Sequence, residues 1–343
     1  MLRYIFKRLL LLIPVVVGIT LFIYVILSVA PGDPAGWRYP PFSGTVADGL
    51  VYGRGAGDDK SSVVAQIMAL VTLARAGVTL NGRFQVAAVA DEESGAKQGT
   101  RWLRDNQHLQ PDFLVVGEQT RNRVAVAERV ACGIDLTIFG KSTHGAMPWA
   151  GDNAVLKTAR VLAWLEQKLF PQLAAKSHPY LPPATLNVGK ISGGWQWNIV
   201  PDACKVEMDR RLLPGETRET AMTEIEALLN EYNATVEPLQ YELFSTGKVA
   251  PNINTKPDEP FVQCAQAALQ DLTGQPQVLT GYVQTSDGRW FAGDGFPIII
   301  FGPSDPAVGH ATDEHVSVEQ LVEATKFLTL LALRWLKIKE NED

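Results

Sequence analysis

The chain has 343 residues, enough for about two domains with separate hydrophobic cores. Hydrophobic residues make up 46% and charged residues 20%, a balance that excludes a wholly disordered chain. The net charge of −6 excludes a broadly basic surface, so we expect no nucleic-acid partner. Cys132, Cys204 and Cys264 show no CxxC spacing, and we expect free thiols rather than a disulfide framework or a zinc site.

An uncharged, apolar run over residues 9–30 comes first in the chain. At about 1.5 Å per residue, a helix of this length crosses a hydrocarbon layer of about 30 Å. Arg3, Lys7 and Arg8 precede the run, and the positive-inside tendency then predicts a cytoplasmic N-terminus. The sequence therefore predicts a single membrane span. A cleaved signal peptide and a soluble buried segment are the alternatives.

The same N-terminal segment resembles the opening of bacterial dipeptide/oligopeptide ABC-transporter permeases, on the stretch MLRYIFKRLLLLIPVVVGITLFIYVILSVAPGDPA. The resemblance ends there, and we treat residues 1–34 as a permease-like membrane segment. A permease needs several spans, and no later stretch of the sequence is long and apolar enough to supply another. We therefore do not expect a transporter.

After this segment the pattern alternates between predicted helices and strands. Apolar residues at helical spacing predict a helix over 61–77, and short apolar runs predict buried strands over 84–90 and 112–117. The next part has amphipathic strands and two helices, over 153–170 and 217–232, which predicts an α+β insertion. The C-terminal part returns to α/β, with the following predicted elements: a buried strand over 296–301 and a closing helix over 317–336.

Acidic side chains gather where the predicted strands end. Asp58 lies in a glycine-rich turn, Glu92 and Glu93 follow one strand, Glu118 follows the next, and His310 follows the last. Open α/β sheets place their sites at strand ends, and buried carboxylates are costly without partners, so the pattern predicts a zinc or similar divalent-metal site. Adjacent extended residues point to different sides, so one glutamate can bind metal while the other takes a proton.

Each of these residues also has an ordinary explanation when taken alone. Asp58 could cap the following helix, the two glutamates could be a solvated loop pair, and His310 could be a loop histidine. The metal-site interpretation depends on their occurring together at consecutive strand ends.

Seven motifs occur in this order between about residue 32 and residue 333: WRYPPFSGTVADGLVYGRGAGDDK, DEESG, GEQT, GKSTHGAMPWAGDNA, NIVPDACKVEMDRRLLPGE, TSDGRWFA and GHATDEHVSVEQL. On these motifs and their order, the sequence resembles the zinc aminoacylase/carboxypeptidase family of acetylornithine deacetylase, succinyl-diaminopimelate desuccinylase and carboxypeptidase G. The resemblance implies an α/β, aminopeptidase-like catalytic domain over 35–128 and 247–338, with a central, mostly parallel sheet. An inserted ferredoxin-like α+β lid or dimerisation domain would occupy 129–246.

The resemblance also implies a two-metal site for Zn²⁺, Co²⁺ or Mn²⁺. Asp58 would bridge the two ions, Glu93 and His310 would bind one of them, and Glu118 would bind the other. Glu92 would be the general base, and a cis peptide bond would follow the bridging aspartate. The implied reaction is hydrolysis of amide bonds in N-acyl amino acids or small peptides by metal-activated water.

Other motif positions match substrate and partner contacts of the family. His144 matches a histidine that reaches the partner's active site and polarises the scissile carbonyl, which implies a homodimer through the inserted domain. A structural loop histidine is its alternative. Asn198 and Arg211 match substrate contacts, and the planar arginine fork suits a free carboxylate. Thr285 is a further candidate, with packing at a strand end as its alternative.

The sequence departs from the family before the glycine-rich turn. The family has a His-x-Asp pair on an early strand, and an ungapped alignment puts Val25 and Leu27 at these positions, with no histidine before His108. We therefore expect the catalytic sheet to lack its first strands, which the permease-like segment replaces. The metal position that keeps only Asp58 and Glu118 should bind weakly, which leaves one or two metal ions per chain and lower activity.

Two rival hypotheses follow from this departure. The chain could be a catalytically inactive, membrane-tethered remnant, or a fusion product. Its location is also open, because the charge bias places the hydrolase part outside a membrane, whereas free thiols and the family's habits favour the cytoplasm.

Overall fold

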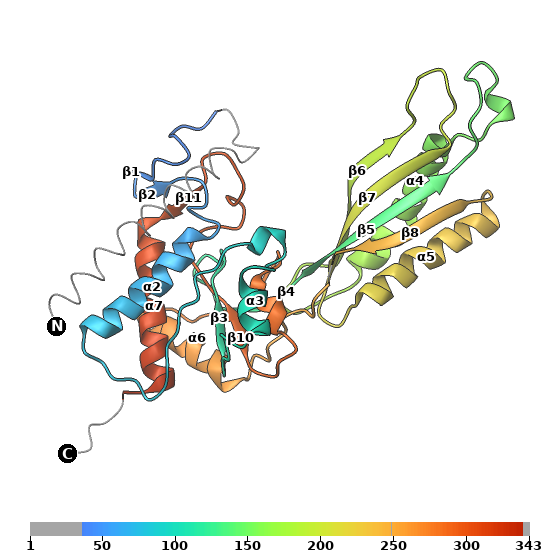
Figure 1. Cartoon of the computed structure of the whole chain (residues 1–343). Coiled ribbons are helices and arrows are strands. Elements are labelled where there is room, and N and C mark those ends of the chain that lie inside the picture. The colour runs from blue at the N-terminus through green and yellow to red at the C-terminus, as the bar shows by residue number, and fades with distance from the viewer. Residues whose placement is uncertain (1–35, 248, 339–343) are drawn as a thin grey trace.

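The computed structural model describes residues 36–247 and 249–338 (Figure 1). The predicted membrane span over 9–30 and the permease-like segment lie outside these residues. Among the helices that are described, none is long and apolar enough to cross a bilayer.

Two small sheets organise the part of the molecule that carries the predicted metal ligands. The first is antiparallel, with the order β1-β2-β11: β1 (Thr45–Ala47), β2 (Leu50–Tyr52) and β11 (His315–Ser317). The second has the order β3-β10-β4-β9: β3 (Leu114–Val116), β10 (Ile298–Ile300), β4 (Ala125–Glu128) and β9 (Thr280–Tyr282). In this sheet β10 runs parallel to β3 but antiparallel to β4, so the sheet is mixed rather than mostly parallel as predicted.

Helices cover these sheets and bury a common core. They are α2 (Lys60–Arg75), α3 (Thr100–Asp105), α6 (Pro260–Thr273) and α7 (Val318–Leu336). Helix α7 packs against both α2 and α6, as Figure 1 shows. Phe327 of α7 lies against Phe301, which follows β10, with ring centroids 4.0 Å apart. Burial of these aromatic and aliphatic side chains anchors α7 onto the sheet that contains β10, the strand that precedes the His310 loop.

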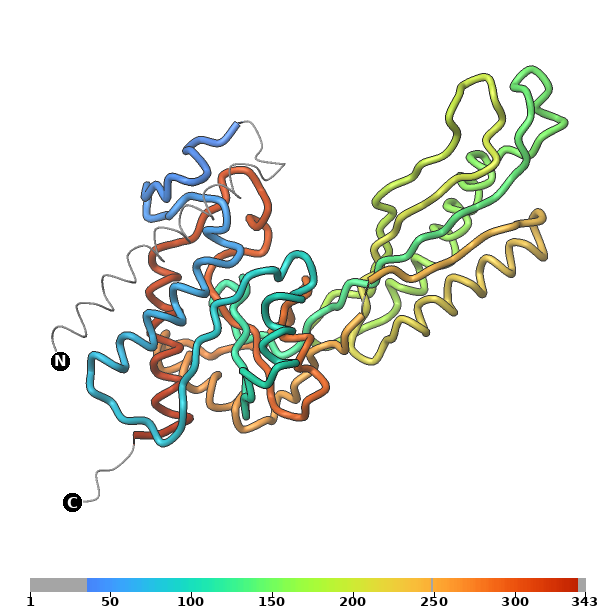
Figure 2. The backbone as a smooth tube through the Cα atoms, viewed as in Figure 1, coloured from blue at the N-terminus to red at the C-terminus, as the bar shows by residue number. Residues whose placement is uncertain are grey.

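The part of the chain over residues 130–246 forms an α+β unit that extends away from the rest of the molecule (Figures 1 and 2). Its sheet is antiparallel in the order β6-β7-β5-β8: β5 (Val130–Phe139), β6 (Thr185–Gly193), β7 (Ala203–Leu212) and β8 (Gln240–Thr246). Buried residues alternate along β5 and β7, and this face packs against α4 (Ala154–Ala174) and α5 (Arg218–Thr235). The strict period of two is the pattern of a sheet covered on one side only.

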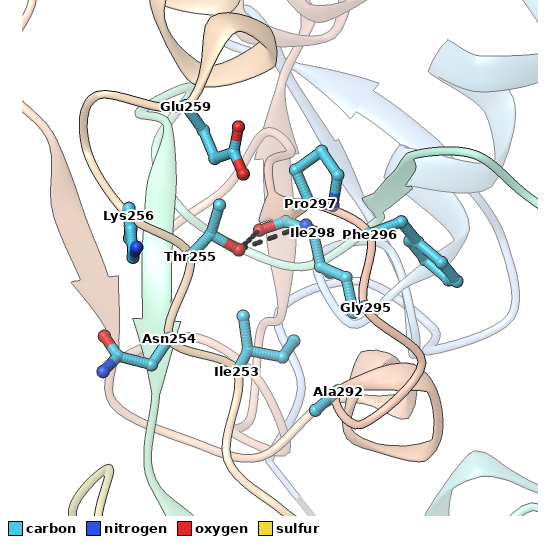
Figure 3. Close-up of a pocket in the computed structure, with 10 residues that line it drawn as sticks. All are labelled: Ile253, Asn254, Thr255, Lys256, Glu259, Ala292, Gly295, Phe296, Pro297 and Ile298. Carbon is cyan, nitrogen blue, oxygen red and sulfur yellow. Dashed lines mark hydrogen bonds between the residues drawn. The ribbon is translucent and has the colours of Figure 1, made fainter.

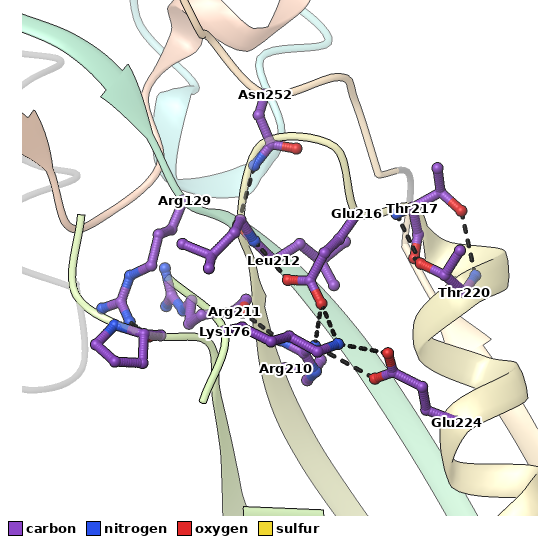
Figure 4. A network of polar contacts seen from close by, with 12 residues as sticks. Arg129, Lys176, Arg210, Arg211, Leu212, Glu216, Thr217, Thr220, Glu224 and Asn252 are labelled. Atoms are coloured by element: carbon purple, nitrogen blue, oxygen red, sulfur yellow. Dashed lines mark hydrogen bonds and ion pairs between the residues drawn. The ribbon is translucent and has the colours of Figure 1, made fainter. Parts of the chain in front are cut away.

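A buried polar network stabilises the end of the α+β unit that joins the rest of the molecule (Figure 4). Arg210 of β7 is fully buried and donates to Glu216 at 2.5 Å, and Lys176 donates to the same carboxylate at 2.6 Å. Lys176 also pairs with Glu224 of α5. Burial alone raises the pKa of Glu216, but the hydrogen bonds from Lys176 and the Leu213 amide and the charge of Arg210 bring it below its usual value. The network therefore joins β7 to helix α5 and to the segment that follows α4.

The predicted helices and two of the predicted strands are confirmed. The helices expected over 61–77, 153–170, 217–232 and 317–336 correspond to α2, α4, α5 and α7, and the strands expected over 112–117 and 296–301 contain β3 and β10. Cys132, Cys204 and Cys264 are free thiols, as predicted.

The strand predicted over 84–90 is wrong, because this segment has no strand structure. A strand requires a neighbouring chain for its ladder of hydrogen bonds. Within the described ranges no segment pairs with residues 84–90, and β3 has only β10 beside it. Apolar composition marks a segment as buried, but it does not provide the partner.

Candidate metal centre

Three of the predicted ligands converge on one point. The Nε2 atom of His310 lies 3.1 Å from Oδ2 of Asp58 and 2.9 Å from Oε1 of Glu93. One ligand atom from each of the three residues lies within 4.8 Å of the other two. We call Asp58, Glu93 and His310 the metal cluster. Two carboxylates and one imidazole are a donor set that zinc binds with water in a further position.

Two members of the metal cluster, Asp58 and His310, lie in loops. Asp58 lies in the glycine-containing turn between β2 and α2, and the peptide bond between Asp58 and Asp59 is cis, as predicted. His310 lies in the loop between β10 and β11 and has a left-handed backbone with φ of 60°. Its side chain is 64% exposed, so the cluster opens to solvent on the side of His310.

The adjacent glutamates reach different partners, although the reason differs from the prediction. Glu92 and Glu93 are in a short 3₁₀-helix, η1 (Glu92–Ser94), and not in extended chain. Asp91 and Gly95, both left-handed, flank this turn. Successive 3₁₀ residues point in directions about 120° apart, so Glu93 faces His310 while Glu92 faces another element.

Glu92 faces Arg289 of η3 (Asp287–Phe291). Its Oε1 atom lies 3.3 Å from Nη1 of Arg289. Burial raises the pKa of Glu92 to about 7, with Arg289 opposing the rise and the charges of Asp287, Glu93 and Asp58 adding to it. A carboxyl with this pKa exchanges a proton readily near neutral pH, which suits a general base.

Glu118 is close to the metal cluster but is not part of it. It follows β3, is buried, and its Oε2 atom accepts a hydrogen bond from the Tyr282 hydroxyl at 2.7 Å. Burial raises the pKa of Glu118, and the negative charges of Asp59 and Asp58 raise it further. Burial likewise raises the pKa of Asp59 to about 8. Crowded carboxylates of this kind are costly to ionise unless a cation neutralises them.

Several buried polar atoms beside these carboxylates lack hydrogen-bond partners within the described residues. They include Oδ1 of Asp59, Oγ of Ser62, and both amide atoms of Gln119. Buried polar atoms are normally paired with protein, water or an ion. Together with the donor atoms of the metal cluster, this unpaired polar surface fits a site that binds one or more divalent cations.

The candidate substrate residues Arg211 and Thr285 meet at the base of the α+β unit. Nη1 of Arg211 lies 3.4 Å from Oγ1 of Thr285, and Nε donates to Asp209 at 2.9 Å. The Thr285 hydroxyl donates to the Arg129 carbonyl at 2.9 Å. Burial lowers the pKa of the Arg129 guanidinium, and the charge of Arg211 lowers it further, so two cations lie near one carboxylate here.

His144 and Asn198 lie elsewhere, in two loops at the outer end of the α+β unit. We call residues 140–153, between β5 and α4, and 194–202, between β6 and β7, the tip loops (Figure 1). The amide of Gly145 donates to the Asn198 carbonyl at 2.7 Å, and Nδ1 of His144 accepts from the Ala146 amide at 3.1 Å. The contacts described for these two residues are all within the tip loops, so the chain does not bring them to its own metal cluster.

Sequence reasoning missed two charged residues that contact the site. Arg289 pairs with Glu92, and Glu314 binds the turn that carries Asp58. Both lie inside quoted motifs, TSDGRWFA and GHATDEHVSVEQL. Nothing in the sequence separates them from surface charges, because each acts on a residue about 200 or more positions away.

A pocket of about 200 Å³ is lined by none of these residues (Figure 3). Lys256, Glu259 and Phe296 are among the residues that line it, and the Thr255 hydroxyl bonds the backbone of Ile298 across it. None of the predicted site residues lines this pocket, and we therefore assign no function to it.

Comparison with known proteins defines the class of this chain: it is a metallohydrolase acting on amide or peptide bonds. It belongs to peptidase family M20/M25/M40, whose model matches residues 28–334. A succinyl-diaminopimelate desuccinylase from Alkalilimnicola ehrlichii is 29% identical over 306 residues, which cover 85% of this chain and 77% of the relative.

Solved structures share the fold. A tripeptidase from Staphylococcus aureus superposes with a TM-score of 0.68 at 22% identity, over 84% of this chain and 74% of that one. The YXEP protein of Bacillus subtilis, described as a dinuclear metal binding peptidase from the M20 family, superposes with a TM-score of 0.58 at 15% identity, over 80% and 71%. At these identities the likeness establishes the fold and leaves the substrate open.

Proposed function

We propose that the chain hydrolyses amide bonds of N-acyl amino acids or small peptides, with a divalent metal ion held by Asp58, Glu93 and His310. The observation that carries this proposal is the convergence of these three side chains, from three segments far apart in the sequence, within 4.8 Å. A zinc, cobalt or manganese ion bound there would polarise a water molecule and the scissile carbonyl.

The chain's own residues supply the proton transfers and hold the substrate. Glu92 takes a proton from the attacking water as the water oxygen bonds to the carbonyl carbon of the substrate. Glu92 then returns this proton to the amide nitrogen as the C–N bond breaks. Its pKa of about 7 supports both directions of transfer. Arg211 and Thr285 bind the free carboxylate of the substrate, since Arg211 and the neighbouring Arg129 leave this region with an excess of positive charge.

We propose one tightly bound ion per chain and a second, weaker position. Glu118 and Asp58 are the protein ligands left for the second position, and burial with neighbouring negative charge already raises the pKa of Glu118. An ion there competes with protons for a site that lacks a histidine, so its affinity is low near neutral pH.

We also propose that the α+β unit is the lid and the dimerisation domain, and that His144 and Asn198 act in the partner's active site. Two features support this. The tip loops expose large aromatic side chains next to these residues: Trp149 is 80%, Trp195 74% and Trp197 94% exposed. Strand β6 is an edge strand whose outward residues are exposed, which leaves a backbone ladder open for a second copy.

Mixing two inactive variants tests this exchange of residues. Glu92→Gln and His144→Ala chains damage different halves of the same composite site. After subunit exchange, half of the dimers are mixed, and each mixed dimer has one intact site, so we expect about one quarter of wild-type activity. A mixture of Glu92→Gln with Glu92→Ala should recover nothing. Activity of the first mixture no higher than that of its parents would contradict action across the dimer.

Hydrolysis of a panel of N-acetyl and N-succinyl amino acids and short peptides tests the main proposal. We expect turnover that a chelator abolishes and that added Zn²⁺, Co²⁺ or Mn²⁺ restores. Rates no higher than those of Glu92→Ala across the whole panel would favour the catalytically inactive remnant. Membrane attachment through residues 9–30 stays a prediction from the sequence, and the reaction does not require it.

A further inference from the structure

One buried carboxylate binds the turn that carries Asp58. Glu314, directly before β11, is 1% exposed. Its Oε1 atom accepts hydrogen bonds from the amides of Asp58 at 2.8 Å and Gly57 at 3.0 Å. Its Oε2 atom accepts from the Gly55 amide at 3.0 Å and from Nη1 of Arg54 at 3.1 Å.

These contacts require a carboxylate. Three backbone N–H groups and one guanidinium point at the two oxygens, and only an ionised carboxyl group offers acceptors on both atoms without a donor of its own. Hydrogen bonds to an ionised acceptor are also stronger than those between neutral groups. A glutamine at this position would turn an NH₂ group toward N–H donors on one side.

The same residue connects the turn to the loop that carries His310. The backbone carbonyl of Glu314 accepts from the Gly53 amide at 2.9 Å. Arg54, besides pairing with Glu314, donates to the carbonyl of Ala311 at 3.1 Å, next to His310. Two of the three loops that form the metal cluster are therefore held together by contacts that involve no metal ion.

We propose that Glu314 is a positioning residue for the metal centre: it holds the turn over residues 53–58 so that Asp58 meets His310 and Glu93 before an ion binds. It touches neither substrate nor reacting atoms. This inference rests on the proposed function for the metal cluster, but it makes a separate statement about the order of the turn in the metal-free chain.

Zinc affinity is the first test, measured by competition with a chromophoric chelator on metal-free full-length protein. We expect Glu314→Gln to bind zinc about 10- to 100-fold more weakly than wild type, as for other residues that orient metal ligands. Glu216→Gln is the matched control, since Glu216 is also a largely buried carboxylate that accepts from an arginine, a lysine and a backbone amide. It should leave zinc affinity unchanged.

Amide hydrogen exchange of the metal-free protein is the second test. In wild type the amides of Gly55, Gly57 and Asp58 should be protected, and in Glu314→Gln they should exchange at least about 10-fold faster while the amides of β5 and β7 do not change. A general loss of stability would raise exchange in all of these segments. Arg54→Gln removes the guanidinium contacts to Glu314 and to the Ala311 carbonyl but keeps the carboxylate and its three backbone hydrogen bonds, so it should give a smaller effect in the same direction.

Each outcome decides the proposal. Equal zinc affinity in folded Glu314→Gln and wild type, or an equal loss in Glu216→Gln, overturns it. If Glu314→Gln does not fold, the wild-type exchange and the Arg54→Gln variant decide instead. Unprotected amides at Gly55, Gly57 and Asp58 in metal-free wild type also overturn it. Wild type that binds no zinc contradicts the proposed function, whereas the exchange comparison still reports on Glu314.

Discussion

Replacement of Glu92 by glutamine is expected to lower kcat for amide hydrolysis by about 10²- to 10⁴-fold, with little change in KM or zinc content. Glutamine has nearly the same shape, and it can keep the contact with Arg289 through its amide oxygen. It cannot accept a proton from water or deliver one to the leaving nitrogen. The loss therefore falls on the chemical step.

The control for this variant is Glu237→Gln. Glu237 forms a two-point ion pair with Arg160, at 2.6 and 2.9 Å, on the α+β unit and away from the metal cluster. Its replacement should leave kcat unchanged, because the pair contributes only local stability. Steady-state kinetics with metal analysis of each preparation measures both effects. A Glu92→Gln enzyme that retains more than about half of wild-type kcat would rule out the general-base role.

Replacement of His310 by asparagine is expected to weaken zinc binding by more than about 100-fold and to abolish activity at ordinary zinc concentrations. His310 supplies the only nitrogen ligand of the metal cluster, and its Nε2 atom lies between the two carboxylates. Asparagine is too short to reach this place. Asp58 and Glu93 alone would leave a weak, two-ligand site.

Asparagine is chosen over alanine because of the backbone. His310 has φ of 60°, a left-handed conformation in which asparagine occurs far more often than alanine. The substitution therefore removes the imidazole without adding a conformational penalty to the loop. Zinc titration and thermal melting of the metal-free variant separate the loss of a ligand from a loss of folding.

His178→Asn is the matched control for this experiment. His178 is a partly exposed histidine that lies outside the metal cluster. Its ring contacts Oδ1 of Asn254 at 3.3 Å and accepts a hydrogen bond from the Tyr180 amide at 3.3 Å. We expect wild-type zinc affinity and activity from it. Zinc affinity of the His310→Asn chain within about threefold of wild type would exclude His310 as a ligand and with it the proposed metal centre.

The sequence alone determined those helices and strands whose apolar residues follow a regular spacing or form a short run. The long helices α2, α4, α5 and α7 follow from apolar residues at helical spacing, and β3 and β10 from short apolar runs. The seven motifs indicated the family, which the match over residues 28–334 establishes. They also indicated Asp58, Glu93 and His310 as members of one site, and the cis peptide bond after Asp58.

Only the tertiary structure decided which residues meet. The run over 84–90 has a strand's composition but no partner among the described strands, because pairing depends on a neighbour that composition does not specify. Glu92 and Glu93 diverge through a 3₁₀ turn and not through extended chain. His144, which lies nearer to Glu118 in the sequence than His310 does, is at the far end of the α+β unit in space.

Glu314 and Arg289 are two further residues whose contacts only the tertiary structure decided. In the sequence they are two charged residues among many, with no spacing that distinguishes them. In the fold, one binds the backbone of a turn and the other faces a proposed base, each across more than half of the chain. Local sequence patterns report secondary-structure propensity and burial. Hydrogen bonds between distant segments depend instead on the tertiary packing of the whole chain.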